Sequence, residues 1–166
     1  DKLCGRFLVV YSPESLWPAA LRFKTQLNEN SKVPAKAEVI PELCHNEVVG
    51  LEGPEELLSG MAVVILRDPE EEAPIRERVE TVKELLDGRV GTLLEFWSRG
   101  SSNIARILSS ILFGDIVSVC LASAYGVNPV EVRSISLIKR RLEKLGVVGK
   151  VFEKLTGRTL SESPPS

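Results

Sequence analysis

Four apolar runs divide the first hundred positions of the chain and predict four strands. Residues 7–11 and 61–66 are apolar at every position, which is typical of strands buried on both faces of a sheet. Residues 37–40 and 92–97 are the other two strand candidates. Because a half-exposed antiparallel strand would alternate apolar and polar residues, these continuous runs favour a parallel sheet.

The segments between and after these strands carry apolar residues at helical spacing. Helices are predicted over residues 16–27, 45–51, 75–86, 104–124 and 128–145. Ser15 is a candidate N-cap for the first helix, and Pro18 falls in its first turn, where a missing N–H costs little. Gly88 and Gly126 are expected to end the third and fourth helices. The acidic run 70–72 is interpreted as the solvated start of the third helix.

Strands and helices therefore alternate, and each crossover between parallel strands needs a covering element. We expect an α/β fold of the flavodoxin-like kind: a three-layer sandwich with a parallel sheet of four or five strands. One domain is expected over residues 1–146, followed by a tail over 147–166 that is partly disordered, above all at 161–166. Ligands of such sheets bind beyond the carboxyl ends of the strands.

The most apolar stretch, residues 104–124, is interpreted as a buried helix and not as a membrane span. Arg106 and Asp115 interrupt it, and a bilayer tolerates such charges poorly. Residues 1–6 lack the apolar core of an export signal. Three scattered cysteines are too few for a disulfide framework and fit a reducing compartment. These features predict a cytoplasmic protein without a membrane partner.

The composition is that of a folded domain, with 43% hydrophobic and 27% charged residues in a chain of 166. These values exclude a fully disordered chain. The chain has 21 basic and 23 acidic residues, a net charge of −2. It therefore lacks the cationic field that a dedicated nucleic-acid binder needs.

Residues 99–103, Arg-Gly-Ser-Ser-Asn, form the best candidate for an anion site. They follow a predicted strand and open a predicted helix, whose free N–H groups could hold an anion. The preferred interpretation is a plain N-cap by Ser101 or Ser102. The chain has no GxxxxGK[ST] phosphate loop, and no GxGxxG follows a strand.

Residues 26–32, Gln-Leu-Asn-Glu-Asn-Ser-Lys, end the first predicted helix with an unusual polar cluster. Glu29 is poorly placed there, since a carboxylate near a helix C-terminus is repelled by the helix dipole. A residue that breaks a local rule is a modest pointer to function. The structural alternative is a left-handed C-cap at Asn30 with Glu29 simply exposed.

The single histidine, His45, lies in residues 41–47, Pro-Glu-Leu-Cys-His-Asn-Glu. A position just after a strand favours a functional role, and a hydrogen-bonded loop residue is the alternative. Cys44 and His45 are adjacent and would point different ways, which argues against a nucleophile pair. Without a second histidine, we expect no metal site.

Residues 24–32 and 41–50 together resemble the second half of the bifunctional phosphoglucose/phosphomannose isomerases, found mainly in archaea and some bacteria. That family carries QxNENxK followed by PExNHNExxG. Residues 115–119, 126–129 and 138–139 resemble its C-terminal end, so the similarity runs from about residue 7 to 145. Cys44 stands where the family has Asn. The family's proteins are about twice as long, with two sugar isomerase (SIS) domains, so this chain resembles the C-terminal SIS half.

The resemblance implies interconversion of glucose 6-phosphate or mannose 6-phosphate with fructose 6-phosphate, through an enediol(ate) and without a cofactor. It implies that Glu29 moves the proton between C1 and C2. His45 of a partner subunit would open the sugar ring, and Lys139 would favour developing negative charge near the ring oxygen. The alternative for Lys139 is a solvated charge on an amphipathic helix. The implied substrate-binding residues are Asn28, Asn30, Glu42 and Asn46.

Glu42 and Glu47 are rival carboxylates, but both lie within the histidine's own turn, so Glu29 is preferred. The resemblance places the phosphate site on a missing N-terminal SIS domain. We therefore expect little activity from the chain alone, and we expect that domain and a second copy as partners. The alternatives are a non-catalytic SIS module that binds sugar phosphates or dimerises, and a phosphosugar isomerase of another epimer preference.

Overall fold

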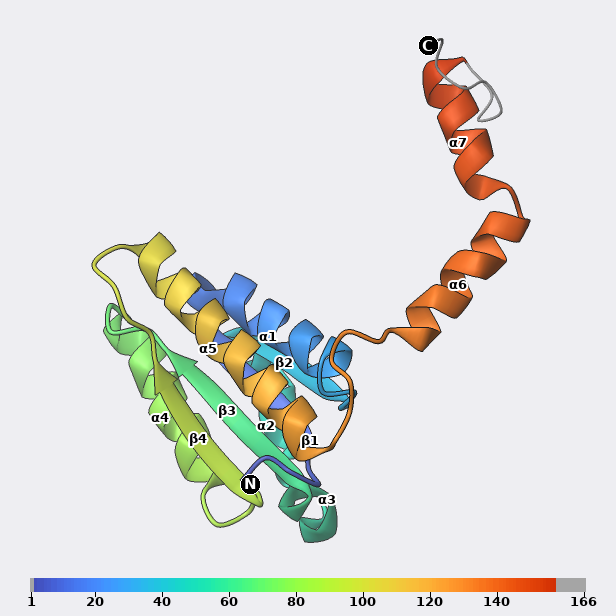
Figure 1. The fold of residues 1–166 in the computed structure, drawn as a ribbon. Helices are drawn as coiled ribbons and strands as arrows, with labels where there is room; N and C mark the ends of the chain where they lie inside the picture. Colours follow the sequence, from blue (N-terminus) through green and yellow to red (C-terminus); the bar gives the residue numbers. More distant parts are fainter. Residues whose placement is uncertain (1, 158–166) are drawn as a thin grey trace. The chain divides into compact units, whose positions relative to one another are not determined.

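The computed structural model describes residues 2–157, and its centre is one four-stranded sheet (Figure 1). The strands are β1 (Phe7–Pro13), β2 (Ala35–Ile40), β3 (Met61–Arg67) and β4 (Thr92–Trp97). They lie in the order β2-β1-β3-β4, and all neighbours are parallel. The prediction of a parallel sheet of four or five strands is confirmed, with four strands in the described residues.

Helices connect each strand to the next. They are η1 (Glu14–Leu16), α1 (Trp17–Glu29), η2 (Glu42–His45), α2 (Glu47–Gly50), α3 (Glu55–Ser59), α4 (Ala73–Leu86), α5 (Asn103–Ala124), α6 (Arg133–Lys144) and α7 (Val147–Thr156). Every predicted helix is present. The short helix α3 and the terminal helix α7 were not predicted.

Two layers of helices cover the sheet (Figure 1). Helices α1 and α5 cover one face, and α2, α3 and α4 lie on the other. Alternate strand residues serve the two faces: Leu8 and Val10 pack toward α1 and α5, whereas Val9 and Tyr11 face the opposite core. All four are essentially inaccessible to solvent, which explains why the first strand is apolar at every position.

Helix α5 corrects the prediction of a fully buried helix, because only one of its sides is buried. Its inner side carries small and polar residues, and Gly114 lies so close to α1 that a Cβ there would be 2.7 Å from the Phe23 ring. Its outer side presents five exposed apolar residues: Ile104, Leu108, Leu112, Ile116 and Val119. Among the described residues, α5 is the one helix long and apolar enough to cross a membrane, and 28% of its apolar window is buried.

Two local predictions about the chain's polar residues are wrong, and the alternative of a left-handed C-cap at Asn30 is not realised. Ser15 does not cap α1, because its hydroxyl donates to Asp68 at 2.8 Å instead. The acidic run does not lie wholly in solvent, since Glu71 is buried. The left-handed residue after α1 is Lys32, with φ of 60°, whereas Asn30 has helical dihedrals.

The chain forms two compact units, Asp1–Val130 and Glu131–Ser166. The first unit contains the sheet and its covering helices; the second contains α6 and α7. The single domain over residues 1–146 stays a prediction. The predicted disordered segment 161–166 lies outside the described residues.

Candidate functional site

Within one chain, Glu29 and His45 lie at opposite ends of the strands: Glu29 at the amino end of the sheet and His45 at its carboxyl end. Helix α1 follows β1 and runs back across the sheet, so Glu29, its last residue, lies beside the strand starts (Figure 1). His45 ends η2, just beyond the carboxyl end of β2. Strand β2 has six residues, a length of about 20 Å at 3.3 Å per residue. The two groups can therefore share a site only if a second chain supplies one of them.

The loop that carries Glu29 is held by its neighbours. The Asn28 amide donates to the carbonyl of Val33 at 2.8 Å, and the Asn30 amide donates to the Ser118 hydroxyl on α5 at 2.8 Å. Glu29 itself is exposed, and its carboxylate forms no hydrogen bond or ion pair within residues 2–157. The side-chain amides of both asparagines thus donate to groups of the fold. Their contact with substrate stays a prediction.

Lys32 completes this arrangement from a left-handed backbone conformation. Its ammonium donates to the carbonyl of Glu29 and, at 3.4 Å, to that of Pro129. Residues other than glycine rarely adopt this backbone conformation, because it costs them about 1–3 kcal/mol. The two bonds tie the end of α1 to the segment that follows α5.

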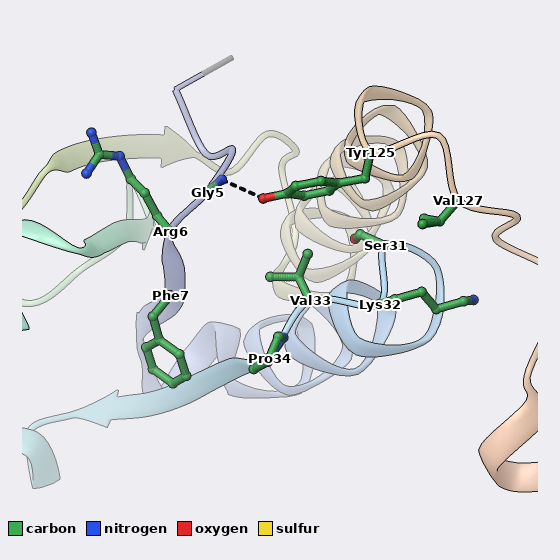
Figure 2. Close-up of a pocket in the computed structure, with 9 residues that line it drawn as sticks. All are labelled: Gly5, Arg6, Phe7, Ser31, Lys32, Val33, Pro34, Tyr125 and Val127. Atoms are coloured by element: carbon green, nitrogen blue, oxygen red, sulfur yellow. Dashed lines mark hydrogen bonds between the residues drawn. The ribbon is translucent and has the colours of Figure 1, made fainter.

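A pocket of about 430 Å³ opens at the same edge of the sheet as Glu29 (Figure 2). The N-terminal segment lies on one side of it, and the loop after α1 and the end of α5 lie on the other. The backbone N–H of Gly5 donates to the Tyr125 hydroxyl at 2.5 Å across this space. The lining is Gly5, Arg6, Phe7, Ser31, Lys32, Val33, Pro34, Tyr125 and Val127.

The His45 loop is anchored by Glu47, the first residue of α2. The Glu47 carboxylate accepts from the Tyr11 hydroxyl at 2.7 Å and from the Lys36 ammonium at 2.6 Å. His45 is exposed, and its imidazole forms no hydrogen bond or ion pair in the described part of the chain. The Asn46 amide donates to Glu42, which is exposed, over 3.4 Å.

These contacts separate the three candidate carboxylates. Both oxygens of Glu47 accept from donors of the fold, so Glu47 is unsuited to abstract a proton from a substrate. Glu29 and Glu42 are exposed. Burial raises the pKa of the Cys44 thiol, which further disfavours a Cys–His nucleophile.

The comparisons with known proteins agree with this arrangement of the polypeptide. The model of the bacterial phospho-glucose isomerase C-terminal SIS domain matches residues 1–142. This chain belongs to that family. A bifunctional phosphoglucose/phosphomannose isomerase of Caldicellulosiruptor bescii is 39% identical over 145 residues, which are 87% of this chain and 43% of the relative. One of Aquifex aeolicus is 38% identical, over 87% of this chain and 45% of the relative.

A solved structure shares the fold of this SIS domain. A glucose-6-phosphate isomerase like protein from Thermus thermophilus superimposes with a TM-score of 0.65 at 27% identity, over 78% of this chain and 43% of that one. The SIS domain thus spans less than half the length of the relatives it matches.

The carboxyl edge of the sheet in this SIS domain is filled by its own charged side chains. Asp68, which follows β3, is buried; its carboxylate accepts from Ser15 and lies 2.8 Å from the Arg106 guanidinium. In residues 99–103, the Ser102 hydroxyl accepts from the backbone N–H of Ala105. The predicted N-cap is therefore confirmed.

A second charged cluster lies beside it and was missed by sequence reasoning. The buried Arg67 binds Glu71, Glu80 and Glu95 at 2.6–3.0 Å. The available signal was an Arg-Asp pair placed directly after a fully apolar strand, because a charge at the end of a buried strand needs partners.

Lys139 belongs to α6, in the second unit of the SIS domain, and it is exposed. Its predicted role stays a prediction. Among the described residues, no group of three or more His, Cys, Asp or Glu side chains could hold a metal ion.

Proposed function

We propose that this chain is the catalytic C-terminal half of a phosphohexose isomerase. It converts glucose 6-phosphate or mannose 6-phosphate to fructose 6-phosphate and back, in the cytoplasm and without a cofactor. Family membership supports the reaction class. The single observation that carries the residue roles is that Glu29 and His45 are both exposed, at opposite ends of the strands, and that neither side chain forms a hydrogen bond or ion pair within residues 2–157. Each is therefore available to a site completed by another chain.

In this proposal, the Glu29 carboxylate removes the proton from one carbon of the open sugar and returns it to the next. A carboxylate can do so on one face of the enediolate. His45 from a second copy exchanges a proton with the ring oxygen, for which an imidazole is suited near neutral pH. Lys139 stabilises the negative charge that develops on oxygen.

The substrate phosphate is bound by the N-terminal SIS domain and not by this chain. An anion that binds beyond the carboxyl ends of parallel strands needs free N–H donors or cations there. Here Asp68 occupies that edge beside Glu71, and Arg106 is already paired. A phosphate would meet buried carboxylates, which repel it. The isolated chain should therefore have little isomerase activity.

The test is a chimera in which residues 1–145 replace the matched part of the Caldicellulosiruptor bescii relative. The chimera should isomerise both sugar phosphates, whereas the 166-residue chain should not. Glu29→Gln should lower kcat by about 10²–10⁴, the usual weight of a general base, and Glu52→Gln, at another exposed carboxylate, serves as the matched control. A loss below tenfold for Glu29→Gln removes this residue from the role. A folded chimera without turnover favours the non-catalytic module.

Sharing of the site between copies has its own test. Glu29→Gln and His45→Asn chimeras, each inactive, are unfolded and refolded together in equal amounts. If one copy supplies Glu29 and the other His45, half of the random dimers carry one intact site. Activity then returns to about a quarter of the unsubstituted level. No recovery in refolded mixed dimers would contradict a site that is shared between copies.

A further inference from the structure

The loop between β2 and α2 has buried groups before His45 but none at His45 itself. Ile40, the last residue of β2, and Leu43 within η2 are fully buried. His45 is exposed and makes no hydrogen bond or ion pair in the described residues. The direction of its imidazole therefore depends on how the backbone is held on either side, and Glu47 is the nearest anchor on the far side.

Glu47 is bound more firmly than an exposed helix residue requires. Its side chain is only 13% exposed, and it receives donors from two adjacent strands, Tyr11 on β1 and Lys36 on β2. Tyr11 is fully buried, so a hydroxyl without this acceptor would cost about 1–3 kcal/mol. The carboxylate thus satisfies a buried donor and fixes the start of α2 against the sheet.

The charges around this contact reinforce it. Burial lowers the pKa of Lys36, but its hydrogen bonds to Glu47 and Glu38 raise that pKa above the ordinary value. Burial and the hydrogen bond to Glu47 both raise the pKa of Tyr11. Near neutral pH, the carboxylate therefore faces one cation and one neutral hydroxyl, and both donate.

We propose that Glu47 is a positioning residue, which holds the loop so that His45 projects from this chain toward the site of a second copy. The inference rests on the proposed function, in which His45 opens the sugar ring. Glu47 acts through the backbone and does not touch the substrate. A displacement of about 1 Å in a reacting group costs up to 10²-fold in rate, so loss of the anchor should appear in kcat.

The presence of one histidine in the sequence gives a direct measurement. In the 166-residue chain, the imidazole 1H–13C resonances report His45 alone, whether or not the chain is an enzyme. Glu47→Gln keeps the shape of the side chain but presents an amide to Lys36. We expect it to shift or broaden the His45 resonances, whereas Glu52→Gln, at an exposed position just after α2, leaves them unchanged. Unchanged resonances in folded Glu47→Gln overturn the proposal.

Kinetics in the chimera and a second variant complete the test. Glu47→Gln should lower kcat about 10–100-fold with little change in KM, and its effect should shrink when Tyr11→Phe is already present, because the two residues share one contact. An unchanged kcat contradicts the positioning role. If Glu47→Gln unfolds the chain, Lys36→Met is measured instead, and the same outcomes decide. An inactive chimera would refute the proposed function, while the resonances would still test the anchor.

Discussion

Arg67 carries a full charge at the end of a buried strand and is only 1% exposed. Burial alone would lower the pKa of this guanidinium, but hydrogen bonds to its carboxylate partners raise it well above the ordinary value. The ring of Trp97 lies 4.5 Å from the guanidinium carbon and adds a cation–π contact. A single buried arginine thus explains why three glutamates gather beside β3 and β4.

The acid sensitivity of this cluster can be predicted from Glu80. Hydrogen bonds from Lys83 and then Arg67 lower the pKa of Glu80 below its ordinary value of 4.5. A carboxylate with a lowered folded pKa stabilises the fold above pH 4.5, and that contribution is lost as the pH falls through the folded value. Glu80→Gln should therefore cost at most about 1 kcal/mol at pH 6, since the side chain is 44% exposed, and less at pH 3.

Urea unfolding of the 166-residue chain at both pH values measures this difference. Glu84→Gln, on the same helix, is the matched control, because Glu84 is exposed and forms no hydrogen bond or ion pair within residues 2–157. A difference between Glu80→Gln and the original chain that grows on acidification would contradict the expected sign.

Sequence patterns did not predict these contacts, because each depends on the burial of a charged group that the local pattern does not reveal. Glu71 resembled a solvated residue at a helix start, yet it is buried because Arg67 is. Ser15 met the rule for an N-cap, but its hydroxyl donates instead to Asp68, the residue that follows β3. Local rules predict a side chain's preferred contacts, and a buried charge nearby overrides them.

The central strands β1 and β3 were predictable, because two-sided burial requires apolar residues at consecutive positions. Helix α5 was predictable in extent but not in orientation. A helix that is apolar on most sides has no periodic signal to mark its inner face. Close approach to α1 decides the matter, because Ser110, Gly114 and Ser118 are small enough to allow it.

Gly114 tests this account of the contact between α1 and α5. A Cβ at this position would lie 2.7–2.9 Å from three Phe23 atoms, so Gly114→Ala forces the helices apart. We expect a loss of about 1–3 kcal/mol in the free energy of unfolding, although alanine alone would favour the helix by about 1 kcal/mol. Ser123→Ala, at an exposed position of α5, should change stability by less than about 0.5 kcal/mol. A neutral or stabilised Gly114→Ala would show that the helices have room to spare.

In the molecule as a whole, local motifs indicate the family, whereas the topology of the fold sets where Glu29 and His45 lie. The motifs around Glu29 and His45 predicted a family that the comparisons confirm. Their separation followed from topology, because a helix after a parallel strand ends at the opposite edge. The rule that ligands bind beyond the carboxyl ends of the strands therefore holds for the position of His45 but not for that of Glu29. Glu47 accepts from Tyr11 on β1 and Lys36 on β2, contacts that no spacing along the chain indicates.

The outer stripe of α5 makes the last prediction, at the scale of the assembly. Its five apolar side chains, Ile104, Leu108, Leu112, Ile116 and Val119, are 49–72% exposed. Such a continuous patch marks an interaction surface. The relatives are more than twice as long as the part that this chain matches, so we expect the remaining domain to cover the stripe.

Leu112→Glu should then leave the stability of the 166-residue chain within about 0.5 kcal/mol and weaken its binding to that domain of the Caldicellulosiruptor bescii relative at least about tenfold, or 1.4 kcal/mol. Sedimentation of this chain alone measures its self-association, and sedimentation of its mixture with that domain measures their binding. Leu57→Glu on α3 is the matched control, because Leu57 is 70% exposed on the opposite face of the sheet. Unchanged binding with loss of self-association would assign the stripe to a second copy, since a charge in an apolar interface destabilises whichever partner buries it.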